Sequence, residues 1–391
     1  MPTAFCCFYE TYPPITGAAS VSWNLVKFSA GSRLLVQCGD RSSRREMPGG
    51  LTVVTVGGRR ENRIAKLAML RKRVAEIANE VRRAGSEVVI LEGASWALYH
   101  LLLLRRLRRE LPEARIIYHS HNVEYLLRRN RNGRAIAALT RWAERRLLRG
   151  ADLSTAVSAA DQAHFARLYG LTPILLPNGV DAERFGAVAS DAVERMRSVY
   201  ALDARTLLFS GFYAYPPNRE AVDFLARSVM PAVRERYPSA TLALTGGGAP
   251  YREPWIRNVG SIPHEDFAAF VAACGVAVAP IFSGSGTRLK ILEAMAAGVP
   301  VVATEKAAEG LGLRDREHAL FAHSPREFAS AVGELFENPE LAAGLVRAAR
   351  QKVNAEFSWR TIVSDFEKTV NAALGAPAHP RYGAALSRAV K

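Results

Sequence analysis

A loop of small residues followed by basic ones separates two apolar runs in the second half of the chain. In order, it holds Gly284, Ser285, Gly286, Thr287, Arg288 and, two residues further, Lys290. The pattern predicts a helix that begins near Thr287, and the unpaired N–H groups and dipole of a helix N-terminus attract anions. Arg288 and Lys290 add two positive charges in the first turn, and Glu293 shares a helix face with Lys290. Such a site suits a nucleotide diphosphate, whose sugar hydroxyls would donate hydrogen bonds to the Glu293 carboxylate.

The plain alternative for this loop is a turn beside a solvated helix face, and a second segment argues against it. Leu175–Phe185 ends a predicted strand and turns sharply at Asn178-Gly179. Together, the two segments resemble the retaining glycosyltransferases of family 4, which have the GT-B fold and contain a PNGVD segment and an E-A-M-A-x-G-x-P-V-V helix. Further matches occur in the expected order at Tyr12–Ala19, His119–Glu124, Ala156–Ser158, Ser210-Gly211, Pro217-Asn218, Leu244–Gly246, Val259–Ser261, Glu309-Gly310 and Phe357–Trp359.

The hydrophobic pattern predicts the same architecture. Short apolar runs alternate with amphipathic stretches such as Ile64–Arg83 and Ala135–Leu148, which predicts α/β domains whose parallel sheets carry helices on both faces. The pattern pauses at Gly186–Ala192, a small and polar segment typical of a hinge, and then begins again. We therefore predict the GT-B fold, two doubly wound Rossmann-like domains that face a central cleft. The resemblance implies an acceptor-binding domain at 1–190, a nucleotide-sugar-binding domain at 200–358, a helix crossing back to the first domain at 359–375, and a basic tail at 376–391.

The resemblance also implies roles for individual residues of the loop and helix. In the family, the Glu that opens E-A-M-A binds the ribose hydroxyls, and that residue is Glu293 here; the alternative is an ordinary glutamate on a helix surface. The family usually has a second Glu eight positions earlier that contacts the donor sugar, and this chain has Ser285 instead. A neutral hydrogen bond contributes about 0.5–1.5 kcal/mol, against about 1.5–3 kcal/mol for one to a charged group. The departure therefore obscures the donor sugar without excluding activity.

Positive charge is expected to stabilise the leaving group. Arg288 and Lys290 would neutralise the diphosphate as its bond to the sugar breaks, a type of stabilisation that is often the largest contribution to catalysis. Many family members use an Arg and a Lys early in the second domain, where this chain offers only Arg219. The sequence contains no convincing Asp-x-Asp metal site. We therefore expect a metal-independent enzyme with no cofactor besides the nucleotide-diphosphate sugar that it consumes.

Three further residues complete the candidate site. His121 follows the predicted strand Arg115–Tyr118, and in the family a His at this place lines the donor-sugar pocket; the alternative is a polar cap on the next helix, which Asn122 could supply alone. Gly17 is expected to let backbone approach the phosphates or the acceptor, although a turn glycine without a ligand is an alternative. Gly211, after a predicted strand, belongs to the predicted nucleotide-binding set. Whether Glu124 orients His121 or is structural stays open.

Basic residues are concentrated in the first half of the chain. Residues 1–186 contain 29 Lys and Arg against 16 Asp and Glu, whereas the rest contains 23 against 21. Such an excess could face an anionic bilayer, where each basic residue near the surface contributes about 1 kcal/mol. It could instead face nucleic acid or only solvent. The nucleic-acid alternative is the weaker one, because the excess is spread over several helices without interleaved aromatic residues.

The chain is expected to be cytoplasmic. Residues Met1–Ile15 do not resemble a secretory signal, and no apolar run approaches the roughly 20 residues of a membrane-spanning helix. The four cysteines have no metal-ligand spacing and are expected to be buried, reduced thiols: Cys6, Cys7, Cys38 and Cys274. A peripheral position on the inner face of the membrane would agree with the basic first half.

The sequence thus predicts a retaining, metal-independent glycosyltransferase. It would move a sugar from a nucleotide-diphosphate sugar to a hydroxyl acceptor, such as a polyprenyl-linked or polysaccharide precursor. Retention follows from the resemblance alone and implies a front-face path without an enzyme nucleophile. Two alternatives stay open: a sugar-nucleotide 2-epimerase, which would need no acceptor, and a non-catalytic GT-B subunit that scaffolds a partner transferase. Ser285 is the residue that keeps the second alternative open.

Overall fold

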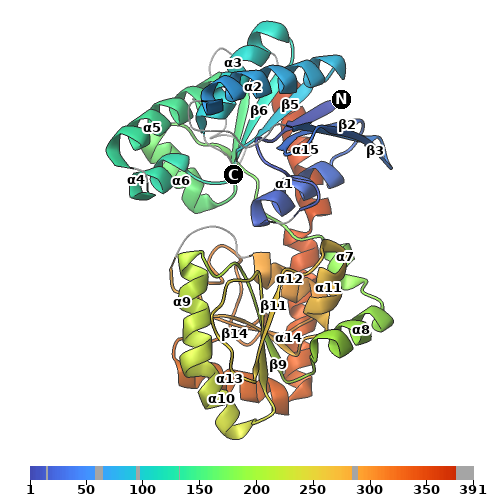
Figure 1. Cartoon of the computed structure of the whole chain (residues 1–391), viewed down its shortest axis with the longest axis vertical. Helices are drawn as coiled ribbons and strands as arrows, with labels where there is room; N and C mark the ends of the chain where they lie inside the picture. The colour runs from blue at the N-terminus through green and yellow to red at the C-terminus, as the bar shows by residue number, and fades with distance from the viewer. Residues whose placement is uncertain (15, 58–64, 94–96, 132, 284–288, 376–391) are drawn as a thin grey trace. The chain divides into compact units, whose positions relative to one another are not determined.

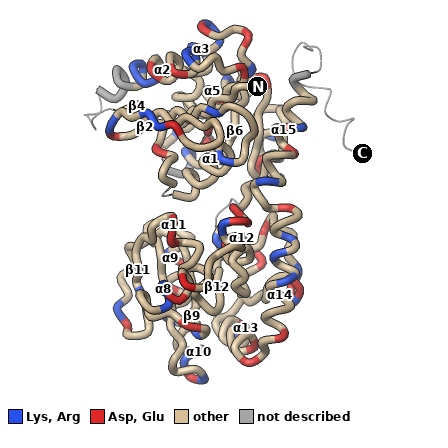
Figure 2. The backbone as a smooth tube through the Cα atoms, turned by 90° about the vertical axis from the view of Figure 1, so that its right-hand side faces the viewer, with Lys and Arg blue, Asp and Glu red and all other residues tan. Residues whose placement is uncertain are grey.

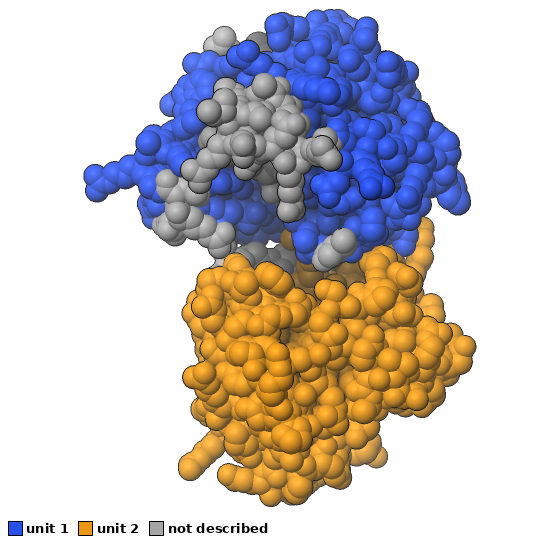
Figure 3. Space-filling view, in the orientation of Figure 1, with its two compact units in different colours: residues 1–177, 362–391 blue, residues 178–361 orange. Residues whose placement is uncertain are grey.

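The chain folds into two compact units (Figures 1 and 3). A computed structural model describes residues 1–14, 16–57, 65–93, 97–131, 133–283 and 289–375. Unit 1 consists of Met1–Pro177 and Ile362–Lys391, and unit 2 consists of Asn178–Thr361. The chain therefore leaves unit 1 once and returns to it within the last described helix, α15 (Trp359–Gly375).

Unit 1 is built on an eight-stranded sheet with the order β3-β4-β2-β1-β5-β6-β7-β8. All of its neighbouring strands pair in parallel except β3, which is antiparallel to β4. The strands are β1 (Thr3–Cys6), β2 (Arg33–Gly39), β3 (Ser43–Met47), β4 (Leu51–Gly57), β5 (Val88–Glu92), β6 (Arg115–Ser120), β7 (Leu153–Ala156) and β8 (Ile174–Leu175). The central strand β5 is buried along its whole length and β6 is buried apart from its first residue, Arg115, as expected of a sheet covered on both faces.

The helices of unit 1 bury apolar faces against this sheet. They are α1 (Gly17–Phe28), α2 (Ala65–Arg83), α3 (Ala97–Glu110), α4 (Glu124–Arg131), α5 (Gly133–Gly150) and α6 (Ala159–Tyr169). Helix α3 packs against both α2 and α5, so the three helices form a layer (Figure 1). Leu101 and Leu104 of α3 and Leu147 of α5 share one core with Val89 and Ile116 of the sheet. None of the helices in the described part of the chain is long and apolar enough to cross a bilayer.

Unit 2 repeats the plan with a six-stranded parallel sheet of the order β11-β10-β9-β12-β13-β14. Its strands are β9 (Thr206–Ser210), β10 (Thr241–Thr245), β11 (Ile256–Gly260), β12 (Val276–Ala279), β13 (Val301–Ala303) and β14 (Leu320–Phe321). Its helices are α7 (Ala182–Gly186), α8 (Ser190–Tyr200), α9 (Pro216–Phe224), α10 (Met230–Arg236), α11 (His264–Ala272), α12 (Leu289–Ala297), α13 (Pro325–Glu337) and α14 (Pro339–Lys352), with π-helical turns at Leu225–Val229 and Val353–Phe357.

The prediction of two doubly wound α/β sheets is confirmed, and three details differ from the sequence analysis or complete it. The antiparallel strand β3 was not predicted, because its residues Ser-Arg-Arg-Glu-Met show no apolar alternation. The predicted hinge at Gly186–Ala192 is not where the units divide, since the boundary falls between Pro177 and Asn178. The four cysteines are buried and free.

The earlier boundary has a physical cause. The Val180 N–H donates to the carbonyl of Phe357 over 2.8 Å, and the ring of Phe185 is buried with its centroid 6.1 Å from that of Phe267. Helix α7 also packs against α11 and α12. These contacts tie residues 178–186 to unit 2, although the sequence predicted them as the end of the first domain.

Candidate functional site

The structure gathers predicted site residues into one polar cluster in each unit. In unit 2, Gly211, Lys290 and Glu293 lie near the carboxyl ends of β9 and β12. In unit 1, His121 follows the carboxyl end of β6, and Gly17 is the first residue of α1. The remaining predicted residues lie outside the described part of the chain: Gly284, Ser285, Gly286, Thr287 and Arg288.

Lys290 stands at the start of helix α12 and is held by contacts from β9 and from the first turn of helix α9. Its Nζ lies 3.0 Å from the Oδ1 of Asn218 and 3.8 Å from the ring centroid of Phe209, a cation–π contact. Asn218 in turn donates from Nδ2 to the carbonyl of Phe212 over 3.0 Å. These two contacts hold the ammonium group of Lys290 beside the end of β9 and restrict the rotamers of this side chain.

Glu293 lies one turn further along α12, on the same helix face as Lys290. Both side chains line a small cavity together with Leu208, Ser210, Val271, Ala277, Val278, Ala279, Ile291 and Val301. Burial among these mostly apolar side chains raises the pKa of Glu293 to about 7, although Arg184 and Lys290 draw it down. At neutral pH the carboxyl group is thus poised between its neutral and ionised forms, and a ligand that donates hydrogen bonds would favour the ionised form.

Gly211 has a packing role that is independent of any ligand. A Cβ added to it would lie 2.7 Å from Nδ2 of Asn218, the residue that also holds Lys290. Gly246, at φ +94°, is equally constrained, because its Cβ would lie 2.6 Å from the carbonyl carbon of Gly211. Gly246 thus lets the ends of β9 and β10 approach closely, and Gly211 leaves room for the Asn218 side chain that contacts Lys290.

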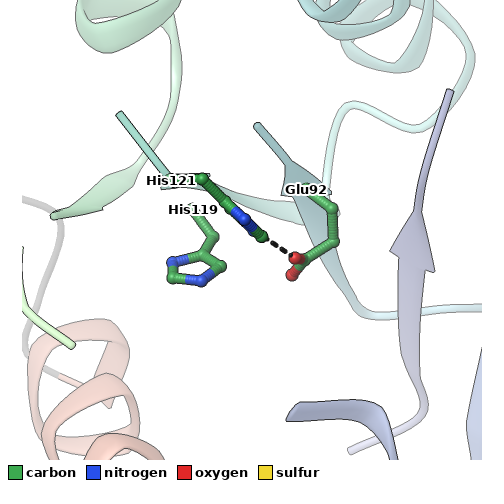
Figure 4. A group of neighbouring side chains, drawn as sticks. All are labelled: Glu92, His119 and His121. Carbon is green, nitrogen blue, oxygen red and sulfur yellow. Dashed lines mark hydrogen bonds and ion pairs between the residues drawn. The ribbon is translucent and has the colours of Figure 1, made fainter. Parts of the chain in front are cut away.

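The cluster in unit 1 centres on Glu92, the last residue of β5. Its Oε2 lies 2.9 Å from Nε2 of His121 (Figure 4). The Ser22 hydroxyl, on α1, donates to the same oxygen, lies 3.5 Å from the same His121 nitrogen, and is 2.6 Å from the hydroxyl of Tyr9. Because β5 and β6 pair in parallel with Glu92 opposite His119, the carboxylate and the imidazole of His121 emerge at the same edge of the sheet.

The Glu92 carboxylate is completely buried, and its surroundings keep it ionised. Burial alone would raise its pKa, but the imidazoles of His119 and His121 and the Ser22 hydroxyl bring that pKa below the ordinary value. His119 is itself neutral at pH 7, because burial lowers its pKa to about 4. Its Nδ1 lies 2.7 Å from the hydroxyl of Thr155. Oε1 of Glu92 and Nε2 of His119 are buried without a hydrogen-bond partner among the described residues.

Glu92, His119 and His121 are the one group in the described part of the chain with the composition of a metal site. Glu92, His119 and His121 each offer a ligand atom, and these atoms lie within 4.8 Å of one another. Oε2 of Glu92 and Nε2 of His121 are already engaged with each other in a hydrogen bond. Ser22 and Tyr9 extend this hydrogen-bond network. The arrangement therefore favours a hydrogen-bonded network that orients His121, with two atoms left for hydroxyl groups or water.

Three residues of this network escaped the sequence analysis: Tyr9, Ser22 and Glu92. For Glu92 a signal was present, because a single carboxylate directly follows the apolar run Val88–Leu91 at the carboxyl end of a predicted strand. Ser22 and Tyr9 carried no comparable signal. Glu124 could either orient His121 or have a structural role. Its carboxylate pairs with Arg128 at 3.3 Å, which favours the structural role.

Gly17 lies at the exposed start of α1, the helix that carries Ser22. The Thr16 hydroxyl caps this helix by accepting from the N–H of Ala19 over 3.2 Å. The cap satisfies one of the N–H groups that a helix start leaves unpaired, and the others suit an anion.

Family models and relatives match most of the chain. A model described as Glycosyltransferase Family 4 matches residues 24–184, and one described as Glycosyl transferases group 1 matches residues 204–338. A GDP-mannose-dependent alpha-(1-6)-phosphatidylinositol monomannoside mannosyltransferase of Mycolicibacterium smegmatis is 31% identical over 67% of this chain and 71% of the relative. A glycogen synthase of Mycobacterium tuberculosis is 28% identical over 59% of this chain and 56% of the relative.

Solved structures show the same fold over almost the whole chain. HepE of Anabaena, in complex with UDP and glucose, superposes with a TM-score of 0.72 at 15% identity and covers 95% of this chain and 100% of that one. Sucrose-phosphate synthase of Thermosynechococcus elongatus superposes with a TM-score of 0.73 at 18% identity and covers 96% and 100%.

The raised pKa of Glu293 predicts a pH-dependent cost in stability. In the unfolded chain this carboxyl ionises near 4.5, and in the folded, ligand-free protein near 7. Stability is therefore lost between these values as the pH rises, because only the unfolded chain gains the charge. We expect the melting temperature of Glu293→Gln to exceed that of the wild type by a difference that grows from about pH 4.5 to about pH 7. Above about pH 7 this difference should stay constant.

Thermal unfolding without ligand, recorded in steps across this range, measures the effect. Glu305→Gln, at an exposed position of the same unit, is the matched control. A gap between Glu293→Gln and wild type that is the same at every pH would contradict the prediction.

Proposed function

This chain belongs to the group 1, family 4 glycosyltransferases and has the GT-B fold, and from that premise we propose a retaining sugar transfer from a nucleotide-diphosphate sugar to a lipid-linked hydroxyl acceptor. The lipid-linked acceptor is suggested by the mycobacterial relative, whose name includes a phosphatidylinositol monomannoside. The same name points to GDP-mannose as donor, whereas the HepE structures hold UDP, so the nucleotide base must be tested.

The observation that carries the proposal is that Lys290 and Glu293 lie on one face of α12 and line the same cavity at the carboxyl edge of the sheet of unit 2. Ligands of doubly wound sheets bind at this edge. A fixed ammonium group suits a phosphate, and a carboxylate one turn away suits the two hydroxyls of a ribose. Arg288 and the loop residues from Gly284 to Thr287 complete the proposed anion site on the strength of the sequence alone.

The proposed chemistry needs charge stabilisation more than an enzyme nucleophile. The bond between the anomeric carbon and the diphosphate oxygen breaks, and its electron pair leaves with the diphosphate. The acceptor oxygen bonds to the same carbon on the same face, and its proton passes to the departing phosphate oxygen. Lys290 and Arg288 stabilise the negative charge that develops on the leaving group. We infer that these two cations serve in place of a metal ion.

In unit 1, we assign His121 to the donor sugar and Glu92 to the positioning of His121. An ionised carboxylate facing Nε2 holds a proton on that nitrogen, which leaves Nδ1 as the nitrogen that can interact with a ligand. No hydrogen bond to Nδ1 occurs among the described residues, and the side chain keeps 6% exposure. A carboxylate that fixes the tautomer and ring orientation of a histidine is a recurring arrangement in enzyme active sites.

The basic first half of the chain is proposed to work at an anionic membrane surface. Residues 1–186 contain 29 basic and 16 acidic residues, and helices α2 and α3 carry many of the basic ones (Figure 2). A lipid-linked acceptor would be presented at such a surface. The comparisons give no support to the alternative of a non-catalytic scaffolding subunit.

Nucleotide binding can be tested by a thermal-shift panel of UDP, GDP, ADP and their sugars. A ligand at 100 times its dissociation constant stabilises the folded state by about 2.7 kcal/mol. We expect one base to raise the melting temperature of the wild type, and Glu293→Ala to lose most of that shift because the ribose hydroxyls lose their acceptor.

Glu305→Ala serves as the control and should keep the full shift. If no nucleotide shifts the wild type, the nucleotide site is refuted. If the bound sugar nucleotide is converted to another without any acceptor, the enzyme is an epimerase and the proposed transfer is wrong.

The role of Glu92 can be tested by replacing its charge. Glu92→Gln keeps the shape but removes the carboxylate that fixes the His121 proton, so we expect kcat to fall about ten- to hundredfold, the equivalent of the roughly 1.5–3 kcal/mol of a charge-assisted hydrogen bond. Nucleotide affinity, measured by the thermal shift, should not change. The measurement is the steady-state rate of nucleotide release with donor and acceptor.

Glu80→Gln is the matched control, since it neutralises a half-buried carboxylate of unit 1 that lies on α2 and pairs with Arg44. A control rate as low as that of Glu92→Gln, or no change in either variant, would argue against a positioning role.

A further inference from the structure

Helix α5 of unit 1 exposes a stripe of large apolar side chains. Ile136, Leu139 and Trp142 are 40%, 41% and 42% exposed, and they follow one another at intervals of three residues. Residues spaced in this way are neighbours on a helix surface, so the three side chains form one continuous stripe. Isolated exposed apolar residues are ordinary, whereas a contiguous group on one element marks an interaction surface.

The stripe is separate from the face that α5 buries in unit 1. Its buried residues are Ala137, Thr140, Ala143, Glu144, Leu147 and Leu148. These positions satisfy the packing of α5 against α3 and α4. The outward stripe contributes nothing to the core of unit 1, and its apolar character therefore calls for another explanation.

The exposed surface of α5 is also strongly basic. The exposed surface of α5 carries Arg134, Arg141, Arg145, Arg146 and Arg149, and the adjacent helix α3 adds exposed Arg105 and Arg109. The one acidic residue of α5, Glu144, is buried and accepts from the N–H of Glu124 over 2.8 Å. On α3, Glu110 lies 2.8 Å from Arg106 and is neutralised by it. The exposed side of α5 thus combines apolar side chains with arginines and no carboxylate of its own.

Two of these arginines flank the tryptophan. The guanidinium carbons of Arg105 and Arg146 lie 5.7 Å and 5.8 Å from the ring of Trp142. A guanidinium group that stacks on an indole keeps its N–H groups directed outward in its own plane, where they suit phosphate oxygens. Neither arginine forms an ion pair with a carboxylate within the described residues.

We propose that the α5 face, defined as Ile136, Leu139, Trp142, Arg105 and Arg146, is the surface by which unit 1 docks on an anionic lipid bilayer. This inference rests on the proposed function, which places a lipid-linked acceptor at a membrane. Apolar side chains with a tryptophan enter the headgroup and acyl boundary, and arginines beside them pair with lipid phosphates. The chemistry recognised is therefore a phosphate-rich surface with hydrocarbon directly beneath it.

A bilayer fits this face better than a protein does. A stable protein interface needs about 20–30 residues on each side, with a core depleted in charge. The α5 face offers three apolar side chains enclosed by like charges, which would repel each other across a twofold contact between copies of this chain. A membrane can be bound reversibly by a few inserted side chains together with several charges.

The test compares vesicle binding of the full-length chain and of two variants. Vesicles of phosphatidylcholine with about a third of phosphatidylglycerol are floated with the protein at physiological salt, beside vesicles of phosphatidylcholine alone. We expect the wild type to bind the anionic vesicles. The triple variant I136S/L139S/W142S should bind them at least about tenfold more weakly. The variant R105Q/R146Q should lose about fivefold for each arginine.

Matched controls are Val199→Ser, which removes an exposed apolar side chain of unit 2, and R326Q/R347Q, which removes two exposed arginines of unit 2. Both should bind as the wild type does. A triple variant that binds like the wild type overturns the proposal, as does a wild type that binds no vesicle. Light scattering that shows a dimeric wild type and a monomeric triple variant also overturns the proposal, because the α5 face would then be the contact with a second copy of the chain.

Nucleotide thermal shifts on the same samples keep this inference separate from the proposed function. A triple variant that keeps the shift but loses vesicles supports the docking face and shows that the variant is folded. A wild type that shifts with nucleotide yet binds no vesicle overturns the docking face alone. A wild type that binds vesicles through this face without any nucleotide shift supports the face and overturns the transferase mechanism.

Discussion

Parallel strand pairing is the constraint on which both polar clusters depend. Each strand ends at the same edge as its neighbours, so side chains that follow different strands meet there even when they are far apart in sequence. Glu92 and His121 are brought together by the pairing of β5 with β6, and Asn218 and Lys290 by the pairing of β9 with β12. The core of each sheet can remain apolar because its polar groups are displaced to this edge.

The clusters use burial in opposite ways. Glu92 is buried with partners that favour its charge, so it stays ionised and holds a proton on His121. Glu293 is enclosed by mostly apolar side chains, and its pKa rises to about 7 because Arg184 and Lys290 only partly compensate the lost hydration. The first carboxylate suits the fixing of geometry and the second suits the reception of a ligand. Their environments, more than their residue type, separate the two roles.

The sequence predicted the sheets because buried parallel strands are short apolar runs, which can be recognised without knowledge of their partners. It missed β3, whose polar residues pair at the edge of the sheet, and it placed the unit boundary too late because the burial of Phe185 depends on Phe267, which lies far along the chain. The shared helix face of Lys290 and Glu293 could be predicted from local spacing, and both side chains line one cavity. Ser22 and Tyr9 were not, because they matter only through contacts with Glu92, from which they are distant in sequence.

Helix α5 links the outer surface of unit 1 to its polar cluster. Its outward face carries Trp142, and its inward face carries Glu144, which accepts from the N–H groups of Glu124 and Tyr125 at the start of α4. Helix α4 begins three residues after His121, so one rigid helix touches both the proposed membrane and the segment that positions this histidine. A contact that orients α5 would therefore fix the height of His121 above the lipid headgroups. For an enzyme whose acceptor is anchored in the bilayer, that height decides which part of the acceptor can reach the donor sugar.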